Sequence, residues 1–429
     1  MAVGILFGVF ALLLIIGVPV AFSLAAASLA TVIYIGLPTL VVVQQLAAGA
    51  SLTTLLAIPL FIFAGEMMMR GGISERLISL AASLVGHLRG GLGQINVLSS
   101  LFFGGVSGSA IADVSAIGGA MIPQMVDRGF ERDYAVSVTV SAAIVALLVP
   151  PSHNLILYSA SAGGGISIAD LFAAGIVPAL LLTVTLMITG AIMARRRGYG
   201  TEPFPGIREV LKRLGAALPG LLLVGVIFGG IRAGVFTAIE SASIAVVYAV
   251  AVTALVYRRL TWHNFVEACS GAVRTTGLIV FVIGAAASFG WLLAYLQIPA
   301  AAVSVLTHIT HDRNLLLLLM IAILLLLGTF MDLAPLIIVC TPIFLPVAIA
   351  IGVDPVHFGV ILILKGGLGL ITPPIGSVLF VGSAIGRISI GQTLKAIWPF
   401  YLAVLAVLLV VAFVPALSLW LPSVLRPPA

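Results

Sequence analysis

Charged residues are scarce in this chain. Asp, Glu, Lys and Arg make up 8% of its 429 residues, whereas about 25% is usual for a soluble domain. Hydrophobic residues make up 62%, and apolar runs recur that are each long enough to cross roughly 30 Å of hydrocarbon. The runs are continuous and do not alternate with polar residues, which excludes a membrane β-barrel. The composition therefore predicts an all-α polytopic membrane protein.

Cysteine is also scarce, since the sequence has two, Cys269 and Cys340. They predict neither a disulfide framework nor a thiolate metal site. The chain has no phosphate-binding loop, which disfavours an ATP-driven pump. No metal-ligand spacing or nucleophile–base pair indicates an enzyme. We therefore expect no enzymatic activity and no cofactor beyond a coupling ion.

The net charge of +6 does not indicate a nucleic-acid partner. In a membrane protein basic residues mark the cytoplasmic loops. The first apolar run, 5–35, has no basic segment before it and no small-residue cleavage site after it, so we expect a retained span and not a signal peptide. The distribution of basic residues predicts a cytoplasmic N-terminus and a periplasmic C-terminus. Treating every apolar run as a simple crossing is the alternative, but it scatters the basic clusters over both faces.

This topology divides the chain into two units. The predicted N-terminal repeat, 1–214, comprises a span 5–35, a span 52–69, an interfacial helix 73–90, a re-entrant hairpin 93–126, a broken span 133–163, a span 169–194 and a cytoplasmic loop 195–213. The predicted second unit, 215–429, comprises a connecting span 216–232 and an inverted repeat made of a span 235–257, an interfacial helix 261–270, a span 272–296, a re-entrant hairpin 315–351, a broken span 357–386 and a span 396–421.

The segment SLFFGGVSGSAIADVSAIGGAMIP, Ser100–Pro123, predicts the first hairpin. It is apolar enough for lipid, yet it contains many glycines and serines and the acidic Asp113. Non-helical backbone at membrane depth is tolerated only where protein or a water-filled cavity satisfies it. We therefore place Ser107-Gly108-Ser109 at a hairpin tip, where two hydroxyls and exposed backbone can bind an ion or a substrate.

Two later segments resemble each other. LVPPSHNLILYSASAGGGISI, 148–168, aligns with ITPPIGSVLFVGSAIGRISI, 371–390, and four landmarks recur at offsets of 221 to 223 residues. Each copy has a Pro-Pro pair, which removes backbone donors and interrupts a helix, leaving carbonyls free for a cation. The predicted topology runs the copies in opposite directions, which is typical of secondary transporters. Chance recurrence of Pro-Pro is the alternative, and the shared offsets argue against it.

Six segments in order resemble a known family, the large membrane subunit of tripartite ATP-independent periplasmic (TRAP) transporters. The resemblance covers essentially the whole chain. The segments that carry it are IPLFIFAGEMMMRGGISERL, VGHLRGGLGQINVLSSLFFGGVSGSAIAD, VPPS, GVFTAIESASIAVVYA, MDLAPLIIVCTPIFLPVAIAIGVDPVHFGV and GLITPPIG.

This resemblance implies a secondary transporter of the ion-transporter superfamily in the bacterial inner membrane, with a scaffold and an elevator-type transport domain. It implies import of a small organic acid coupled to a cation, which we expect to be Na⁺. It also implies two protein partners: a periplasmic substrate-binding protein and a small four-helix membrane subunit, expected as a separate chain.

The resemblance implies ion- or substrate-binding positions in both halves. They are Ser107, Gly108, Ser109, Asp113, Pro150, Pro151, Ser152, Asn154, Thr329, Asp332, Thr372, Pro373 and Pro374. A Na⁺ site is expected from backbone carbonyls near Ser107, Pro150, Thr329 and Pro373. Lys365 and His153 are candidate counter-ions for the substrate.

Several of these residues have alternative roles. Asp113 could instead cap the helix that follows the hairpin. His153 could be a neutral, hydrogen-bonded histidine. An intramembrane lysine is costly, so Lys365 could form a structural ion pair or take the place of a cation. For Glu66, an interfacial ion pair with Arg70 is the expected role.

Two other functions fit the sequence less well. One is a stand-alone anion carrier of related fold that needs no binding protein. The other is an ion channel with re-entrant loops, which conducts without alternating access. The opposed repeats favour the transporter. C4-dicarboxylates, sugar acids, keto acids and sialic acid all fit the expected substrate class.

Overall fold

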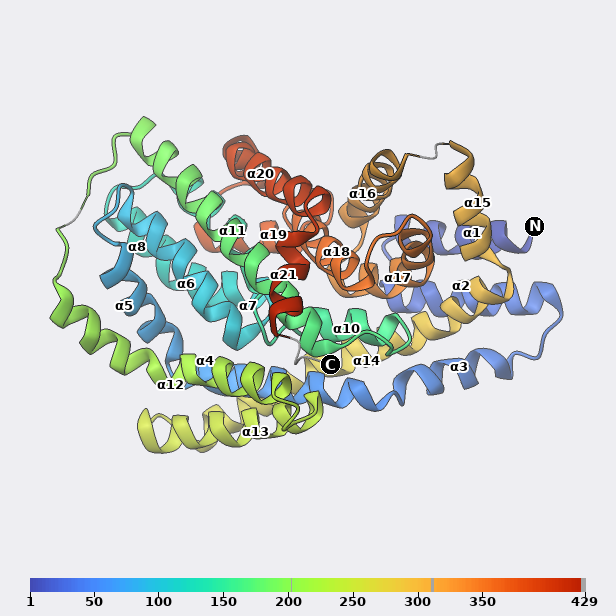
Figure 1. The fold of residues 1–429 in the computed structure, drawn as a ribbon, viewed down its shortest axis with the longest axis horizontal. Helices are drawn as coiled ribbons and strands as arrows, with labels where there is room; N and C mark the ends of the chain where they lie inside the picture. The colour runs from blue at the N-terminus through green and yellow to red at the C-terminus, as the bar shows by residue number, and fades with distance from the viewer. Residues whose placement is uncertain (202, 310–311, 426–429) are drawn as a thin grey trace.

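The computed structural model describes residues 1–201, 203–309 and 312–425, and every regular element in these ranges is helical (Figure 1). Within them seven helices are long and apolar enough to cross a membrane. These are Ile168–Arg196, Ile207–Arg232, Ala238–Val256, Trp262–Tyr295, Arg313–Phe330, Leu333–Ala350 and Ile390–Phe413. The all-α class predicted from composition is confirmed.

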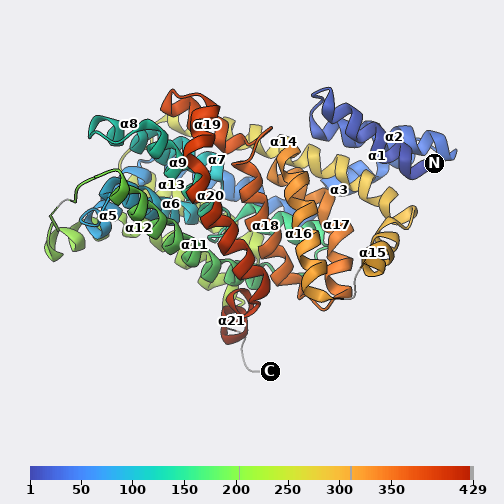
Figure 2. The same cartoon turned by 90° about the horizontal axis from the view of Figure 1, so that it is seen from above.

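The first apolar run forms two helices, α1 (Ala2–Ile15) and α2 (Val20–Ile35), which pack side by side near the N-terminus (Figure 2). Gly17 between them has a φ of +89°, which glycine adopts without strain. Pro19 follows at the N-cap of α2, a position that suits its missing N–H. The chain turns between the two helices, and this corrects the single span predicted over 5–35.

A long band of helices forms one edge of the molecule (Figure 1). It contains α3 (Leu40–Ala50), η1 (Thr53–Leu56) and α4 (Ala57–Arg70), and both α3 and α4 pack along α14 (Trp262–Tyr295). Gly284 of α14 permits this close packing, because a Cβ on it would lie 2.9 Å from a carbonyl oxygen of α3. Helix α3 was not predicted.

Other boundaries also differ from the prediction. Helix α14 is continuous where an interfacial helix 261–270 and a separate span 272–296 were expected. Helix α12 (Ile207–Arg232) begins inside the predicted loop 195–213. Helix α15 (Ile298–Ile309) had no counterpart in the prediction. In α12 and α14 the helix includes a glycine and charged residues that the sequence pattern alone treats as a boundary.

The first hairpin and the helices around it follow α4. They are α5 (Ile73–Val85), α6 (Gly91–Ser107), α7 (Ala110–Asp113), the π-helical η2 (Val114–Gly118), α8 (Gly119–Asp127), α9 (Arg132–Ala142), the 3₁₀ helix η3 (Ala143–Leu147), α10 (His153–Ser161) and α11 (Ile168–Arg196). Helix α6 packs against α7, η2 and α8, so the chain reverses direction at the α6–α7 turn.

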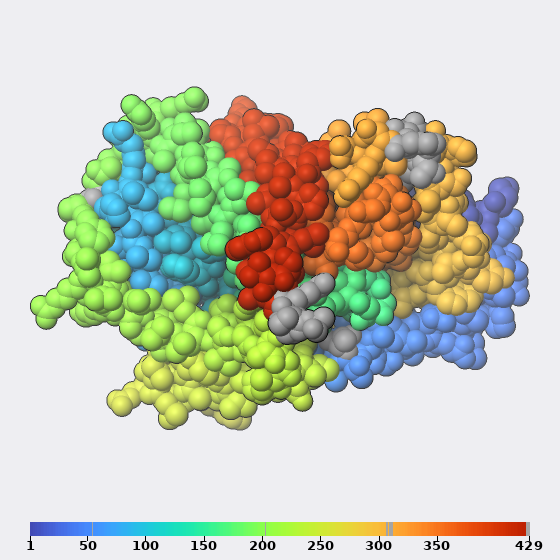
Figure 3. Space-filling model, viewed as in Figure 1, coloured from blue at the N-terminus to red at the C-terminus, as the bar shows by residue number. Residues whose placement is uncertain are grey.

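The remaining helices build a second hairpin and a second broken helix. They are α13 (Ala238–Ala251), the π-helical η4 (Val252–Val256), α16 (Arg313–Phe330), α17 (Leu333–Ala350), α18 (Pro355–Leu370), α19 (Ser377–Gly386), α20 (Ile390–Phe413) and α21 (Ala416–Leu425). Helices α20 and α21 cross one face between α11 and the α16–α17 pair (Figure 3). They cover α9 and α18 from that side.

Side-chain caps start several of these helices. The N-cap side chains of α11, α18 and α20 each accept a hydrogen bond from the first turn of their own helix. They are Ser167, Asp354 and Ser389, respectively. Thr237 and Glu240 form a reciprocal capping box at the start of α13. The carboxylate of Glu240 therefore serves the helix terminus, as expected for a Thr-x-x-Glu sequence.

Candidate functional site

The tip of the first hairpin lies against the first Pro-Pro break. Helix α6 ends at Ser107, and Gly108 has a φ of +59°. A Cβ on Gly108 would lie 2.7 Å from the Pro151 carbonyl oxygen, so the approach of the two backbones requires glycine. The Asn154 amide donates to the Gly108 carbonyl at 3.3 Å. Ser109 caps α7 by accepting from its first turn.

The second hairpin and the second break show a related arrangement. The Ile375 N–H donates to the Thr329 carbonyl at 3.2 Å. The Ser377 hydroxyl donates to Asp332 Oδ1 at 3.1 Å. Ser377 follows Asn154 by 223 residues, the spacing that separates Pro373 from Pro150. In each half, the first turn after the break therefore holds the hairpin tip.

Ser377 was not among the predicted site residues. Applying the repeat offset to Asn154 would have identified it from the sequence. Thr275 of α14 was also missed, and no sequence signal singles it out.

Both hairpin tips line one cavity of about 300 Å³. It brings together four predicted residues, Ser109, His153, Asn154 and Asp332, with Thr275 on the opposite wall. The rest of the lining is mostly apolar and comes from α14, α17 and the ends of η3 and α18. A few polar groups in an otherwise apolar cavity are typical of small-molecule sites.

The other predicted residues lie away from this cavity. Ser107 lines a smaller adjoining cavity of about 90 Å³, together with Glu66. Neither cavity is lined by the two Pro-Pro pairs, Ser152, Thr329 or Thr372. Lys365 is fully buried on α18 and does not line either cavity.

Asp113 is fully buried one turn beyond the first tip. Its Oδ2 accepts from the Ser100 hydroxyl at 2.7 Å, and its Oδ1 has no hydrogen-bond partner among the residues described. The N-cap of α7 is Ser109, so the alternative that Asp113 caps this helix is wrong. Glu66 and Arg70 form the expected ion pair, with Oε2 and Nε 3.5 Å apart.

Two helix N-termini open onto the larger cavity. His153 and Asn154 are the first residues of α10, and Leu333 and Ala334 are the first of α17. Neither N-cap side chain accepts a hydrogen bond from these first turns. Unsatisfied N–H groups at helix N-termini favour negative charge. The cavity can therefore accept an anionic group without a cationic side chain in its lining.

Comparisons with known proteins identify the family to which the chain belongs. A family model described as "Tripartite ATP-independent periplasmic transporter, DctM component" matches residues 7–417. The chain is 39% identical over 427 residues to YgiK of Salmonella typhimurium, covering 99% of this chain and 98% of that protein. It is 38% identical over 422 residues to the sialic acid TRAP transporter large permease protein SiaM of Vibrio cholerae, covering 98% of each.

A solved structure shares the fold at low sequence identity. The Alcanivorax borkumensis YdaH transporter superposes with a TM-score of 0.62 over 87% of this chain and 86% of that chain, at 16% identity. From the family model and the relatives, we conclude that this chain belongs to the tripartite ATP-independent periplasmic transporter family, as a DctM component or large permease.

Proposed function

We propose that this multi-pass inner-membrane permease imports an organic acid by cation-coupled secondary transport, with Na⁺ as the cation. The observation that carries the proposal is the cavity of about 300 Å³ between the two hairpin tips. Its polar groups converge from both halves of the chain, as expected for a transporter site at a repeat interface. The sialic acid named for SiaM is an example of the carboxylate class that we propose here.

The carboxylate of the substrate would lie at the first turns of α10 and α17. His153 lines the cavity beside Ser109 and Asp332, so its ring can contact the same carboxylate. Lys365 is fully buried behind the wall, which favours His153 as the side chain next to the substrate.

The coupling cation would bind to backbone carbonyls at the hairpin tips and the helix breaks. Near Ser107 and Pro150, the end of α6 lies against the first break, and a Cβ on Gly105 would be 3.3 Å from the Pro150 carbonyl oxygen. Oxygen-only coordination suits a hard cation such as Na⁺. In the other half, Thr329 and Pro373 occupy the related positions.

Alternating access would follow an elevator mechanism. The two hairpins and the two broken helices would move as one transport domain against the band formed by α3, α4 and α14. We place the N-terminus in the cytoplasm and the C-terminus in the periplasm. The halves would then be inverted repeats joined by α12.

Two partners complete the proposal. A periplasmic substrate-binding protein would deliver the organic acid, and a small four-helix subunit would pack on the permease in the bilayer. Exposed apolar side chains of the band and of the neighbouring α2 offer a surface for that subunit or for lipid; they include Val43, Val273 and, on α2, Phe22.

The test is uptake into proteoliposomes that contain the chain with its small subunit. The labelled substrate is the carboxylate that stabilises the cognate binding protein in a thermal-shift screen. We expect accumulation only when both an inward Na⁺ gradient and the loaded binding protein are present. Uptake without the binding protein would indicate a stand-alone carrier, and passive unsaturable flux would indicate a channel; either result refutes the proposal.

A further inference from the structure

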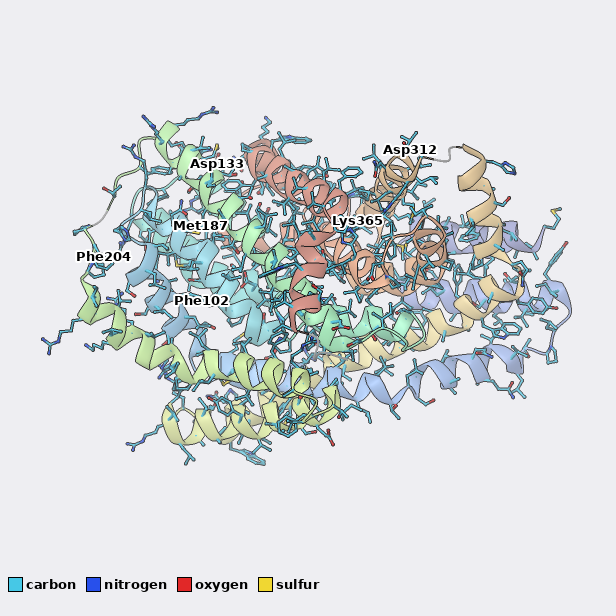
Figure 4. The ribbon with its side chains drawn as sticks, in the orientation of Figure 1. Phe102, Asp133, Met187, Phe204, Asp312 and Lys365 are labelled. Carbon is cyan, nitrogen blue, oxygen red and sulfur yellow. The ribbon has the colours of Figure 1, made fainter. Side chains whose placement is uncertain are left out.

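Lys365 is a fully buried cation in the middle of the molecule. It lies on α18, next to α16 and α17 (Figure 4), and its side chain is fully buried. Its ammonium nitrogen Nζ has no hydrogen-bond partner among the residues described. Charged side chains within a membrane are costly and are usually paired or functional. The surroundings of Lys365 therefore have to compensate for its charge.

The end of α16 provides that compensation. A Cβ on Gly328 would lie 2.7 Å from Lys365 Nζ, so the ammonium sits directly against this last turn. Helix α16 ends at Phe330, and in the described structure neither Met331 nor Asp332 donates its N–H to the helix. The Thr329 carbonyl accepts from the Ile375 N–H, whereas the neighbouring carbonyls of this last turn receive no N–H from Met331 or Asp332. A helix C-terminus favours positive charge.

Helix α18 is held close to this helix end by a glycine contact. A Cβ on Gly369 would lie 2.7 Å from the Gly328 carbonyl oxygen, so only glycine permits this approach. Gly369 is one turn beyond Lys365 and four residues before Pro373. The ammonium therefore occupies the region of carbonyls, near Thr329 and the second Pro-Pro break, in which the proposed function places a cation.

The N-terminal half has a related close approach of helices without the lysine. There a Cβ on Gly104 would lie 2.6 Å from Ala146 Cα, which joins α6 to η3 as Gly328 joins α16 to α18. The residue 223 positions before Lys365 is Ala142, which is also fully buried. At this pair of positions the C-terminal half therefore carries an ammonium side chain where the N-terminal half carries a methyl group.

We infer that the Lys365 ammonium is a built-in substitute for a coupling cation in the C-terminal half. It would hold the positive charge between the end of α16 and the second break, and the chain would bind its mobile Na⁺ at the first hairpin alone. This inference rests on the proposed function, which places a coupling cation at carbonyls of this kind.

Removing the ammonium while leaving its space open should create a Na⁺ site. In Lys365→Ala the vacated volume exposes the carbonyls of α16, and in Lys365→Gln the amide oxygen adds a ligand. Lys365→Met removes the charge but fills the space. We therefore expect the Ala and Gln variants to bind one more Na⁺ per chain than the wild type, and the Met variant to bind the same number.

The measurement is binding of radiolabelled Na⁺ to the full chain purified in detergent, with choline chloride holding the ionic strength constant. Lys395→Ala, at an exposed position on α20, is the matched control and should not change the number bound. Cooperative thermal unfolding of each variant confirms that it is folded. If the Ala variant does not fold, the comparison of Gln with Met decides the question.

The outcomes separate this inference from the proposed function. An unchanged number in folded Ala or Gln variants overturns the inference, even if the wild type binds Na⁺. A gain in the Met variant as well also overturns it, since the site would then not depend on vacated space. Absence of Na⁺ binding by the wild type counts against the proposed Na⁺ coupling. A gain of one Na⁺ in the Ala or Gln variant, but not in the Met variant, supports the role of Lys365 whether or not the wild type binds Na⁺.

Discussion

At the first hairpin, some buried polar atoms have hydrogen-bond partners among the described residues and others have none. Asn96 donates to the Thr139 hydroxyl at 2.6 Å, and Thr139 donates in turn to the Ala135 carbonyl. Asp113 uses one carboxylate oxygen for Ser100 and leaves the other without a partner in the described structure. A buried acceptor without a partner is costly. Such a group is retained where a bound ion or a moving proton uses it, and this argues for a role in transport for Asp113.

Asp113→Asn tests this role. Asparagine can still accept from Ser100, so the hairpin should fold, but its negative charge is lost. Because a hydrogen bond or contact to a charged group contributes about 1.5–3 kcal/mol, we expect Na⁺ affinity to fall about tenfold or more. A titration with radiolabelled Na⁺ measures the affinity, and thermal unfolding checks the fold.

Asp127→Asn is the control for this prediction. Asp127 ends α8 of the same hairpin and is exposed, so its loss should not change Na⁺ affinity. Equal affinity in Asp113→Asn and wild type would exclude Asp113 from the ion site.

At the scale of elements, glycines set the distance between packed helices. A Cβ on Gly65 of α4 would lie 2.8 Å from the Val106 carbonyl oxygen of α6. A Cβ on Gly382 of α19 would lie 2.1 Å from a Val140 methyl group of α9. Small residues at helix contacts are typical of membrane proteins. Lipid is as apolar as the helix surfaces, so the helices associate through close packing and not through the hydrophobic effect.

Gly369→Ala should destabilise the C-terminal half. The added methyl group would meet the Gly328 carbonyl at 2.7 Å, so α16 and α18 must move apart. Overpacking of this kind typically costs about 1–3 kcal/mol. The free energy of unfolding in mixed detergent micelles measures the effect.

Gly277→Ala provides the comparison for this substitution. Gly277 lies on α14 with nothing within 4 Å of its Cβ position, so alanine there should be neutral or slightly stabilising. If both substitutions gave the same free energy of unfolding, the close approach of α16 and α18 would not be under steric control.

At the scale of the whole molecule, ion pairs join segments that are distant in the sequence. Arg70 of α4 pairs with Glu267 of α14, and Arg259 pairs with Glu75 of α5 at 3.0 Å. A further pair, Arg232 with Asp170 at 3.0 Å, joins α12 to α11 across the molecule. Its side chains are only 14% and 12% exposed, so solvent screens it less than the other pairs.

A cross-link between band and hairpin tests the elevator mechanism. A Cβ on Gly65 would lie 3.6 Å from Ser107 Cα, close enough for a disulfide between cysteines at these two positions. A Cβ on Gly65 also meets the Val106 carbonyl oxygen at 2.8 Å, so uptake by the reduced double variant is the reference. If the hairpin moves against α4, oxidation of Gly65→Cys/Ser107→Cys should abolish that uptake, and reduction should restore it. Native Cys269 and Cys340 are first replaced by alanine.

Gly284→Cys/Leu46→Cys is the matched cross-link. It joins α14 to α3 within the band, where a Cβ on Gly284 would lie 3.3 Å from Leu46 Cγ. This pair should retain uptake after oxidation. Full uptake with the Gly65–Ser107 disulfide closed would contradict an elevator movement of the first hairpin.

Local features of the chain follow from the residues that form them. The scarcity of charge and the length of the apolar runs predict membrane helices, because an unpaired backbone or side chain is costly in lipid. The Pro-Pro pairs and Gly108 predict where helices stop, since proline lacks a donor and glycine permits positive φ. The turn at Gly17 and the continuity of α14 were missed, because neighbouring apolar residues support either helix or turn there.

Contacts between distant segments depend on packing. The sequence identified Ser109, Asn154 and Asp332 one by one, but only the folded chain brings them into one cavity with Thr275. It also separates Lys365 from that cavity and places it at the end of α16. The physical reason is that helix starts and breaks are set by neighbouring residues, whereas the site depends on how whole helices pack together.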